Sequence, residues 1–490
     1  MNNYKTYEQD GISEMYSHEP NLQSPVFGVC GASNNPNSYL KNITIKIKTG
    51  PVQPNEKVPK RIISRYFGHT KYDIDVKSWG GLKVLQDKHC KPKPNCKSCP
   101  LKYLCKHYSF KGQNGSNPSF AEFFCGAGGM SLGFEQAGFS PKFVLDNDPW
   151  SLFTYKWNRP ELLNKIDIYL ADIRDFMPKH LENREVDLVA GGVPCQPFSN
   201  ANRQRNISDS RWSLFQNFVA HAVALSPKMI LIENVSGFRE VAKECTSHLE
   251  SFGYETKSFY LNASEYGVPQ PRSRVFILAL SRMDYKYPNN AFREFEDKLE
   301  DMRQPAQTLR NAIGDLPILA PNRVRNAPAS ESAESGFAFT WSGNPNQSIY
   351  VLGINSTPSS HALFNHKARY NNERDIKIFS LLKQGEDSRS ESIMDIMPYK
   401  NRSGIFHDKY YKLPYDKACR TITAHMRYDC NSYIHPEQPR GLTVREAARV
   451  QGFPDDYVFT GTFQRLYQQV GNAVPPPFAK CIAHACQNII

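Results

Sequence analysis

The 490-residue sequence predicts an α/β fold built on a mostly parallel sheet. From Phe120 onwards, short apolar runs of strand length alternate with longer segments of helical pattern. Such alternation is typical of parallel strands that are covered by helices on both faces. The polar residues that could carry chemistry directly follow several of these runs, and ligands of open sheets bind at the carboxyl ends of the strands.

The expected elements can be placed in order along the chain. The strands are FAEFFC from Phe120, FVLD (143–146), DIYL (167–170), VDLVAG (186–191) and MILIEN (229–234). Helices are expected from about Met130, after the second strand through Asn158, near 212–224, and after the fifth strand.

Two further segments have a different character. Residues 1–115 are largely irregular and form an N-terminal module, which the linker KGQNGSNPS joins to a domain at 116–281. From 282 to 415 the alternation stops and Asn, Ser, Pro and Arg become frequent, so we expect an inserted domain there.

Positive charge is concentrated in the N-terminal module. Residues 1–115 contain 18 Lys and Arg against 8 Asp and Glu, a net +10 out of +12 for the whole chain. Clustered Lys and Arg release counterions when they meet phosphates, so the module is predicted to contact nucleic acid; a well-solvated surface is the alternative. The sequence shows no apolar run of membrane-spanning length and no hydrophobic signal region, so we expect a cytoplasmic protein, associated with the nucleoid if prokaryotic.

A glycine-rich turn and two acids follow the first three strands. In FFCGAGGMSLGF, Gly126, Gly128 and Gly129 precede a helix and allow the backbone to approach a ligand closely. The spacing is not the dinucleotide fingerprint, and taken alone the turn could be purely structural. Asp146 ends the second strand and Asp172 follows the third, where acids commonly hold ribose hydroxyls. Together these positions predict a site for a cofactor that contains adenosine.

The motif GGVPCQPFS places Cys195 between two prolines at the end of the fourth strand. A structural cysteine is positioned by packing alone, so this framing indicates a thiol that must be aimed. Glu233 directly follows the apolar run MILI, so its carboxylate is expected at the same sheet edge. Arg272 and Arg274 alternate along a later strand and should share one face. Since an ordinary thiol is only a few per cent ionised at neutral pH, nearby cations would activate it.

Seven motifs in series resemble those of the DNA cytosine-5 methyltransferases: FFCGAGGMSLGF, VPCQPFS, DSRWSLF, ENV, YGVPQPRSR, LTVREAARVQGFPDDY and QQVGNAVPPP. The resemblance covers roughly 120–280 and 417–490. It implies the Rossmann-like fold of S-adenosylmethionine-dependent methyltransferases, with a target-recognition domain at 282–415 and residues 416–490 returning to the catalytic domain. It also implies methyl transfer from S-adenosylmethionine to C5 of cytosine in a specific double-stranded DNA sequence, by a monomeric enzyme that can be paired with a separately encoded restriction endonuclease.

The resemblance gives each matching residue a role. Cys195 would attack C6 of a flipped cytosine, Glu233 would hold and protonate N3, and Arg272 and Arg274 would lie near the base. Gln196–Ser208 would be the loop that closes over DNA. The residues implied in cofactor binding are Phe124, Gly126, Gly128, Gly129, Asp146, Asp172, Ile173, Pro194, Leu214 and Asn472.

Some positions bear on specificity or depart from the family's pattern. Glu122 stands where aspartate is usual, Asp146 where glutamate is common, and Asn147 where an aromatic residue is often found. Thr421–Thr423 and Arg440 would fix the recognition domain against the catalytic domain. The candidates for reading base edges, by residue type alone, are Arg323, Arg325 and Arg369.

The segment CKPKPNCKSCPLKYLC holds four cysteines with the spacing C-x5-C-x2-C-x5-C among five lysines: Cys90, Cys96, Cys99 and Cys105. Structural zinc usually uses two separated pairs, whereas a compact four-cysteine loop suits a cubane cluster. The segment resembles the cluster loop of endonuclease III-like glycosylases, although its first spacing is one residue shorter. We expect a [4Fe-4S] cluster, with zinc as the alternative, in a loop that docks on phosphates.

Two other functions share part of this pattern. A tRNA cytosine-5 methyltransferase of the DNA-enzyme type has the same motifs but usually lacks a large recognition insert. A catalytically silent DNA-binding regulator would not need Cys195, Glu233, Arg272 and Arg274 together.

Overall fold

A computed structural model describes residues 117–162, 165–177, 185–194, 212–240, 242–324, 332, 334–341, 347–355, 362–398 and 409–490. Cys195, Gln196–Ser208 and Arg325 lie outside the described residues, as does the whole N-terminal module with its four-cysteine loop.

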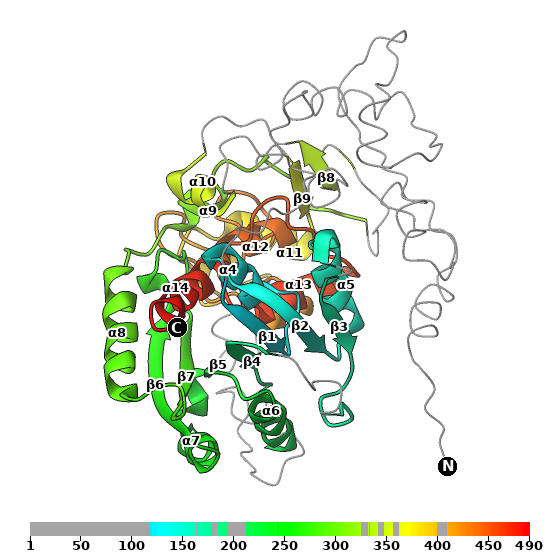
Figure 1. Cartoon of the computed structure of the whole chain (residues 1–490). Coiled ribbons are helices and arrows are strands. Elements are labelled where there is room, and N and C mark those ends of the chain that lie inside the picture. Colours follow the sequence, from blue (N-terminus) through cyan, green and yellow to red (C-terminus); the bar gives the residue numbers. More distant parts are fainter. Residues whose placement is uncertain are drawn as a thin grey trace, which may run out of the picture.

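A seven-stranded sheet forms the centre of the structure, in the order β3-β2-β1-β4-β5-β7-β6 (Figure 1). The strands are β1 (Ser119–Phe123), β2 (Ser140–Asp146), β3 (Asp167–Leu170), β4 (Leu188–Gly192), β5 (Met229–Val235), β6 (Tyr254–Asn262) and β7 (Ser273–Ser281). The pairs β1–β2, β1–β4, β2–β3 and β4–β5 are parallel, whereas β7 runs antiparallel to both β5 and β6. The predicted mostly parallel α/β fold is confirmed.

Helices cover both faces of this sheet. The helices are α4 (Gly129–Ala137), α5 (Pro149–Trp157), α6 (Trp212–Ala224), α7 (Ala242–Ser251), α8 (Pro288–Asp301), α9 (Leu309–Ile313), α10 (Ile349–Asn355), α11 (Glu373–Leu381), α12 (Val444–Val450), α13 (Phe463–Asn472) and α14 (Pro476–Gln487). Short 3-10 helices lie at Pro160–Leu162, Ser236–Glu240, Ala263–Glu265, Glu391–Ile393 and Ala424–Arg427. α4, α8 and α14 pack on one face through residues such as Phe134, Phe295 and Phe478. α6 and α7 pack on the other through Phe218 and Leu249.

Helix α8 lies in the segment expected to form the recognition domain, but it packs on the sheet (Figure 1). Phe292, Phe295 and Leu299 join the core of the sheet, and the ring centroid of Phe295 is 4.8 Å from that of Phe259 on β6. The packing of α8 is therefore part of the core of the sheet. The amphipathic face of α8 covers the apolar face that the antiparallel pair β6–β7 adds to the sheet.

The described remainder of the insert is built largely on the C-terminal segment. β8 (Gly336–Trp341) and β9 (Ala362–Lys367) form an antiparallel pair, and a separate apolar cluster joins α9 to α12 and α13. Arg440 contacts the insert, since its Nε donates to Leu319 O at 3.3 Å. The Thr421 hydroxyl instead donates to Pro271 O at 2.6 Å, which joins the C-terminal segment to the residues just before β7.

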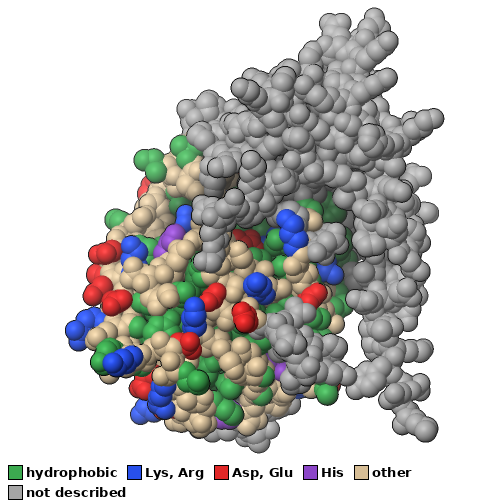
Figure 2. All heavy atoms as spheres, in the orientation of Figure 1, with side chains coloured by type: hydrophobic (Ala, Val, Ile, Leu, Met, Phe, Trp, Pro, Cys, Tyr) green, Lys and Arg blue, Asp and Glu red, His purple; other side chains and the backbone are tan. Residues whose placement is uncertain are grey.

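Charges on the described surface are mixed in sign. On the face shown in Figure 2, Lys and Arg side chains are interspersed with Asp and Glu side chains. This matches the sequence, in which nearly all of the positive excess lies before residue 116. Within the described ranges, no helix combines the length and apolar character needed to span a membrane.

Candidate active site

The glycine-rich turn and the strand that leads to VPCQPFS lie where the connectivity of the sheet reverses, between β1 and β4. From β1 the chain proceeds outward through β2 to β3, and from β4 it proceeds the other way to β5. Phe123, the last residue of β1, lies opposite Gly191 near the end of β4. The carboxyl ends of two such strands leave a crevice between their diverging loops, which is where α/β proteins of this kind bind ligands.

Glu233 stands directly beside the strand end that leads to Cys195. The register of β4 and β5 pairs Gly192 with Glu233, and Gly192 precedes Cys195 by three residues. The next residue, Asn234, is buried, and its Nδ2 donates to Val193 O at 3.2 Å. The ENV motif therefore holds the backbone just before the predicted nucleophile, and this hydrogen bond links ENV to VPCQPFS.

The carboxylate of Glu233 is held by Arg274. Arg274 Nε lies 2.8 Å from Glu233 Oε1, and both side chains are only 13% exposed. A Cβ atom at Gly192 would lie 3.5 Å from Glu233 Oε2 and 3.9 Å from the backbone oxygen of Phe124. A side chain at 192 would therefore contact both the carboxylate and the end of β1. The ion pair fixes the carboxyl group beside Gly192.

Arg272 has different partners from Arg274. It precedes β7, is 2% exposed, and donates to Ile422 O at 2.6 Å and to Gly471 O at 2.9 Å. Burial, together with the charge of Arg274, lowers its pKa well below the ordinary arginine value. Arg272 therefore fixes the backbone on both sides of the site, and Gly471 is followed by Asn472, which is exposed at the end of α13.

The predicted cofactor turn adopts a conformation that its glycines permit. Gly126 and Gly128 have φ values of 54° and 82°, and Phe124 also lies in the left-handed region at 57°. Gly126 N donates to Asp146 Oδ2 at 2.7 Å, and a Cβ atom at Gly126 would meet nothing within 4 Å. The turn therefore presents backbone to open space beside a carboxylate. Burial raises the pKa of Asp146, although backbone N–H groups of Asp148 and Gly126 oppose the shift.

Asp172, Ile173, Pro194 and Leu214 are further residues that the resemblance implied in cofactor binding. Asp172 accepts two hydrogen bonds from the guanidinium of Arg174, at 2.9 and 2.6 Å, and this contact lowers the pKa of the carboxyl group. Ile173 is buried, whereas Pro194 is exposed at the end of the β4 segment. Leu214 lies near the start of α6 and packs against the core. Asp146 and Asp172 follow adjacent strands, so both acids lie at one edge.

Arg159, which lies outside the motifs, and Tyr457, the last residue of LTVREAARVQGFPDDY, support the glycine turn. Arg159, which is 2% exposed, donates to Gly128 O at 3.1 Å and to Tyr457 Oη at 2.9 Å, and the Tyr457 hydroxyl donates to Ala127 O. A Cβ atom at Gly128 would lie 2.7 Å from the Tyr155 ring, so only glycine fits there. These contacts tie the turn to the C-terminal segment.

Glu122, the departure from the family's aspartate, lies in the same buried region. Its carboxyl group accepts a hydrogen bond from the Ser131 hydroxyl, and burial raises its pKa to about 8. At neutral pH this carboxyl group is therefore mostly protonated. It acts as a neutral part of the packing below the turn and not as a charged ligand.

Among the recognition candidates, Arg369 and Arg323 are described. Arg369 donates to the backbone oxygens of Met426, Arg427 and Tyr428, so its guanidinium closes the end of the 3-10 helix Ala424–Arg427. Arg323 forms an exposed ion pair with Glu373 at 3.3 Å. Arg369 is thus a support for a loop and not itself a free side chain.

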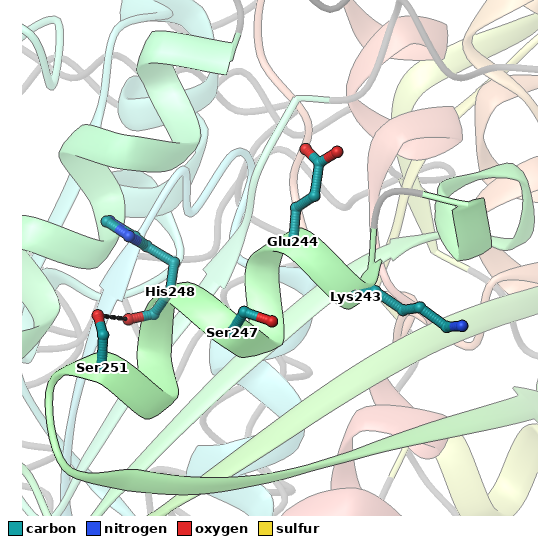
Figure 3. Close-up of a pocket in the computed structure, with 5 residues that line it drawn as sticks. All are labelled: Lys243, Glu244, Ser247, His248 and Ser251. Atoms are coloured by element: carbon teal, nitrogen blue, oxygen red, sulfur yellow. Dashed lines mark hydrogen bonds between the residues drawn. The ribbon is translucent and has the colours of Figure 1, made fainter.

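A shallow depression on the outer face of α7 is separate from these residues (Figure 3). It is lined by Lys243, Glu244, Ser247, His248 and Ser251, and the Ser251 hydroxyl donates to His248 O at 2.7 Å. All five come from one helix, and none of them belongs to the motifs. In the described ranges no group of three or more His, Cys, Asp and Glu could hold a metal ion.

The sheet topology, the glycine turn and the two acids at the strand ends define the class of S-adenosylmethionine-dependent methyltransferases. Comparisons place the chain more closely. The model of the family described as C-5 cytosine-specific DNA methylase matches residues 119–488. The chain belongs to this family and is a DNA cytosine-5-methyltransferase that uses S-adenosylmethionine as methyl donor.

Similar proteins cover most of the chain. The type II methyltransferase M.AgeI of Thalassovita gelatinovora is 30% identical over 423 residues, covering 74% of this chain and 97% of the relative. The type II methyltransferase M1.HphI of Haemophilus parahaemolyticus is 33% identical over 377 residues, covering 75% and 86%. A crystal structure of a prophage-encoded E. coli protein, described as a DNA modification methyltransferase, matches with a TM-score of 0.57 at 21% identity over 76% of this chain and 99% of that one. This last likeness shows the fold.

Proposed function

We propose that Cys195 and Glu233 methylate C5 of a cytosine that has been rotated out of a specific duplex DNA sequence. The observation that carries the proposal is the carboxylate of Glu233, held by Arg274 next to Gly192, on the strand end that leads into Cys195. A flipped base that binds beside Gly192 would place its N3 edge against this carboxyl group. The target base must leave the stack for any residue at a sheet edge to reach it.

The chemistry follows from the poor nucleophilicity of C5. The Cys195 thiolate bonds to C6, the C5–C6 double bond opens, and the electron pair is delocalised toward N3, where the Glu233 carboxyl group supplies a proton. S-adenosylmethionine, when bound, supplies the electrophilic methyl group that C5 accepts. A base then removes the proton from C5, the C5–C6 double bond re-forms as the thiolate leaves, and N3 returns its proton to the Glu233 carboxylate. Arg274 keeps Glu233 oriented toward N3 throughout.

Two observations support the binding of the methyl donor by the residues of this chain. The glycine turn presents its backbone to open space, and the Asp146 carboxylate beside it is already fixed by the Gly126 N–H. We assign Asp146 to the ribose hydroxyls, Asp172 and Ile173 to the adenine, and Phe124 to stacking against the adenine. Gly128, Gly129, Pro194, Leu214 and Asn472 complete the lining.

Replacing Glu233 with glutamine should lower methyl transfer about 10² to 10⁴-fold, since the amide cannot give a proton to N3. The measurement is the single-turnover rate on duplex DNA whose target site has been mapped by bisulfite sequencing. Glu265→Gln is a matched control, because Glu265 pairs with Arg303 at 2.5 Å on the exposed surface. A rate in Glu233→Gln equal to that of the control would contradict the proposal. Methylation of tRNA in preference to duplex DNA would favour the alternative substrate.

The relatives are named type II methyltransferases, and we propose that this enzyme likewise works beside a restriction endonuclease. Genomic DNA from cells that produce the enzyme should then resist an endonuclease that cleaves the mapped site. We also propose that the enzyme acts as a monomer associated with the nucleoid.

On the sequence spacing alone we further propose that Cys90, Cys96, Cys99 and Cys105 hold a [4Fe-4S] cluster. Protein purified without oxygen should contain about four iron and four sulfide per chain, with zinc as the alternative occupant. Cys96→Ser should lower the metal content, whereas Cys481→Ser, on α14, should not. Protein free of both metals would refute the site.

A further inference from the structure

We infer that His221, which lies outside all of the motifs, is a positioning residue that holds the adenine-binding segment in place. The inference rests on the proposed assignment of Asp172 and Ile173 to the adenine. His221 lies on α6 and is 3% exposed, and its Nε2 is 3.0 Å from the backbone oxygen of Ile173. It therefore makes a direct hydrogen bond to the predicted cofactor segment from behind.

The hydrogen-bond partner fixes the state of the imidazole ring. A carbonyl oxygen can only accept, so Nε2 must carry the hydrogen. Nδ1 is buried and has no hydrogen-bond partner among the described residues. Burial lowers the pKa of His221, so the ring is neutral at neutral pH and Nδ1 stays unprotonated. His221 is therefore held as the tautomer with its hydrogen on Nε2, and this N–H donates to the backbone oxygen of Ile173.

Aromatic packing fixes the position of the ring. The ring centroids of His221 and Phe123 are 6.0 Å apart with an interplanar angle of 14°. Phe176 meets the imidazole edge to face at 5.7 Å and 73°. Phe123 ends β1 immediately before Phe124, and Phe176 follows Ile173 by three residues. The imidazole therefore fills the space between the end of β1 and the segment after β3.

The segment is thus held from two sides. His221 fixes the Ile173 backbone from the interior, and Arg174 fixes the Asp172 carboxylate from the surface. If the interior bond is lost, a buried carbonyl remains without a donor, and the segment must move to recover one. A movement of Ile173 displaces Asp172, its neighbour in the chain. The expected consequence is weaker binding of the adenosine moiety, with the cytosine side of the site unaffected.

Two substitutions separate the hydrogen bond from simple packing. Glutamine can place its side-chain amide nitrogen near the position of the imidazole Nε2, so His221→Gln should keep the donor. Leucine fills similar space but donates nothing. His221→Leu should weaken the binding of S-adenosylhomocysteine to the full-length enzyme on the order of tenfold, measured by titration calorimetry. His221→Gln should remain within about twofold of the unmodified enzyme, as should His248→Leu on α7.

Kinetics on duplex DNA supply the second readout. The KM for S-adenosylmethionine should rise in His221→Leu, while the KM for DNA should stay the same. Equal losses for both substrates, or equal losses in His221→Leu and His221→Gln, would indicate a general structural role and overturn the inference. If His221→Leu does not fold, His221→Asn provides the test, because its shorter amide cannot reach Ile173.

Asp172→Ala distinguishes this inference from the function on which it rests. If Asp172→Ala leaves the affinity for S-adenosylhomocysteine unchanged, the adenine assignment fails and the inference fails with it. If Asp172→Ala weakens binding but folded His221→Leu does not, the inference alone is overturned. Weakened binding in both variants, with retention in His221→Gln, is the expected result.

Discussion

Replacing Cys195 with alanine should reduce methyl transfer on the order of 10⁶-fold, which is the scale of loss when an enzyme loses its nucleophile. Without the thiolate no bond forms to C6, and C5 remains part of an aromatic ring that does not attack a methyl donor. Binding to duplex DNA should persist, because phosphate contacts supply most of the affinity and involve other residues. The two measurements are single-turnover methyl transfer and DNA binding at fixed salt.

A modified substrate gives a second test of Cys195 as the nucleophile. A duplex with fluorine at C5 of the target cytosine should trap the unmodified enzyme as a covalent adduct, because fluorine cannot leave as a cation in the way that the C5 proton does. Cys195→Ala should form no adduct, whereas Cys481→Ala, a substitution on α14, should form it normally. An adduct in Cys195→Ala would show that another residue is the nucleophile.

The sheet could be predicted from sequence where its strands are buried parallel runs. β3 lies exactly at the predicted residues 167–170, and α6 spans the predicted 212–224, because apolar runs and helical periodicity are local signals. The direction of β7 has no such signal. It pairs antiparallel with both β5 and β6, and a strand's direction depends on how the chain returns to the sheet. The packing of α8 could not be predicted for the same reason, because the apolar face of a helix does not indicate which surface it covers.

In the site, too, residues next to strand ends could be predicted from the sequence, whereas residues whose partners are far away in the chain could not. Glu233 and the glycine turn could be predicted because each directly follows a strand, and strand ends meet at one edge. Arg159 and His221 could not, because each acts through a backbone oxygen that is 31 or 48 residues away in the chain. Tyr457 contacts Ala127 across 330 residues. A single buried polar residue has no periodicity, and its partner is defined only by the fold.

The motif LTVREAARVQGFPDDY has a structural role in addition to any role in methyl transfer. Arg449 is fully buried, and its guanidinium meets Asp455 at 2.7 and 2.8 Å, Ala312 O at 3.1 Å, and the carboxylate of Asp315. Asp315 follows α9 in the inserted segment, whereas Asp455 belongs to the C-terminal segment. One arginine therefore joins two parts of the chain that are 134 residues apart.

Arg449→Met should destabilise the folded enzyme by about 3–5 kcal/mol, the cost of removing one partner from a buried ion pair. Methionine fills much of the volume but removes the cation that the buried carboxylates of Asp315 and Asp455 share. The measurement is the unfolding midpoint in denaturant. Arg465→Met is the control, since Arg465 meets Asp148 at 3.8 Å on the surface, and such exposed pairs contribute about 0–1 kcal/mol. Equal midpoints for the two variants would contradict the prediction.

The pH dependence of the stability lost in Arg449→Met identifies the cause of that loss. In the unmodified enzyme, burial tends to raise the pKa of Asp455, but Arg449 overcomes it and the pKa is lowered. Without Arg449, only the charge of Arg445 and the hydrogen bond from Asn355 oppose burial, so the folded-state pKa of Asp455 should rise. The folded variant then binds a proton more readily than the folded unmodified enzyme does, so its deficit in stability should shrink as the pH falls toward that raised pKa. A lost packing contact would give a deficit that does not change with pH, so the titration separates an uncompensated buried charge from a cavity.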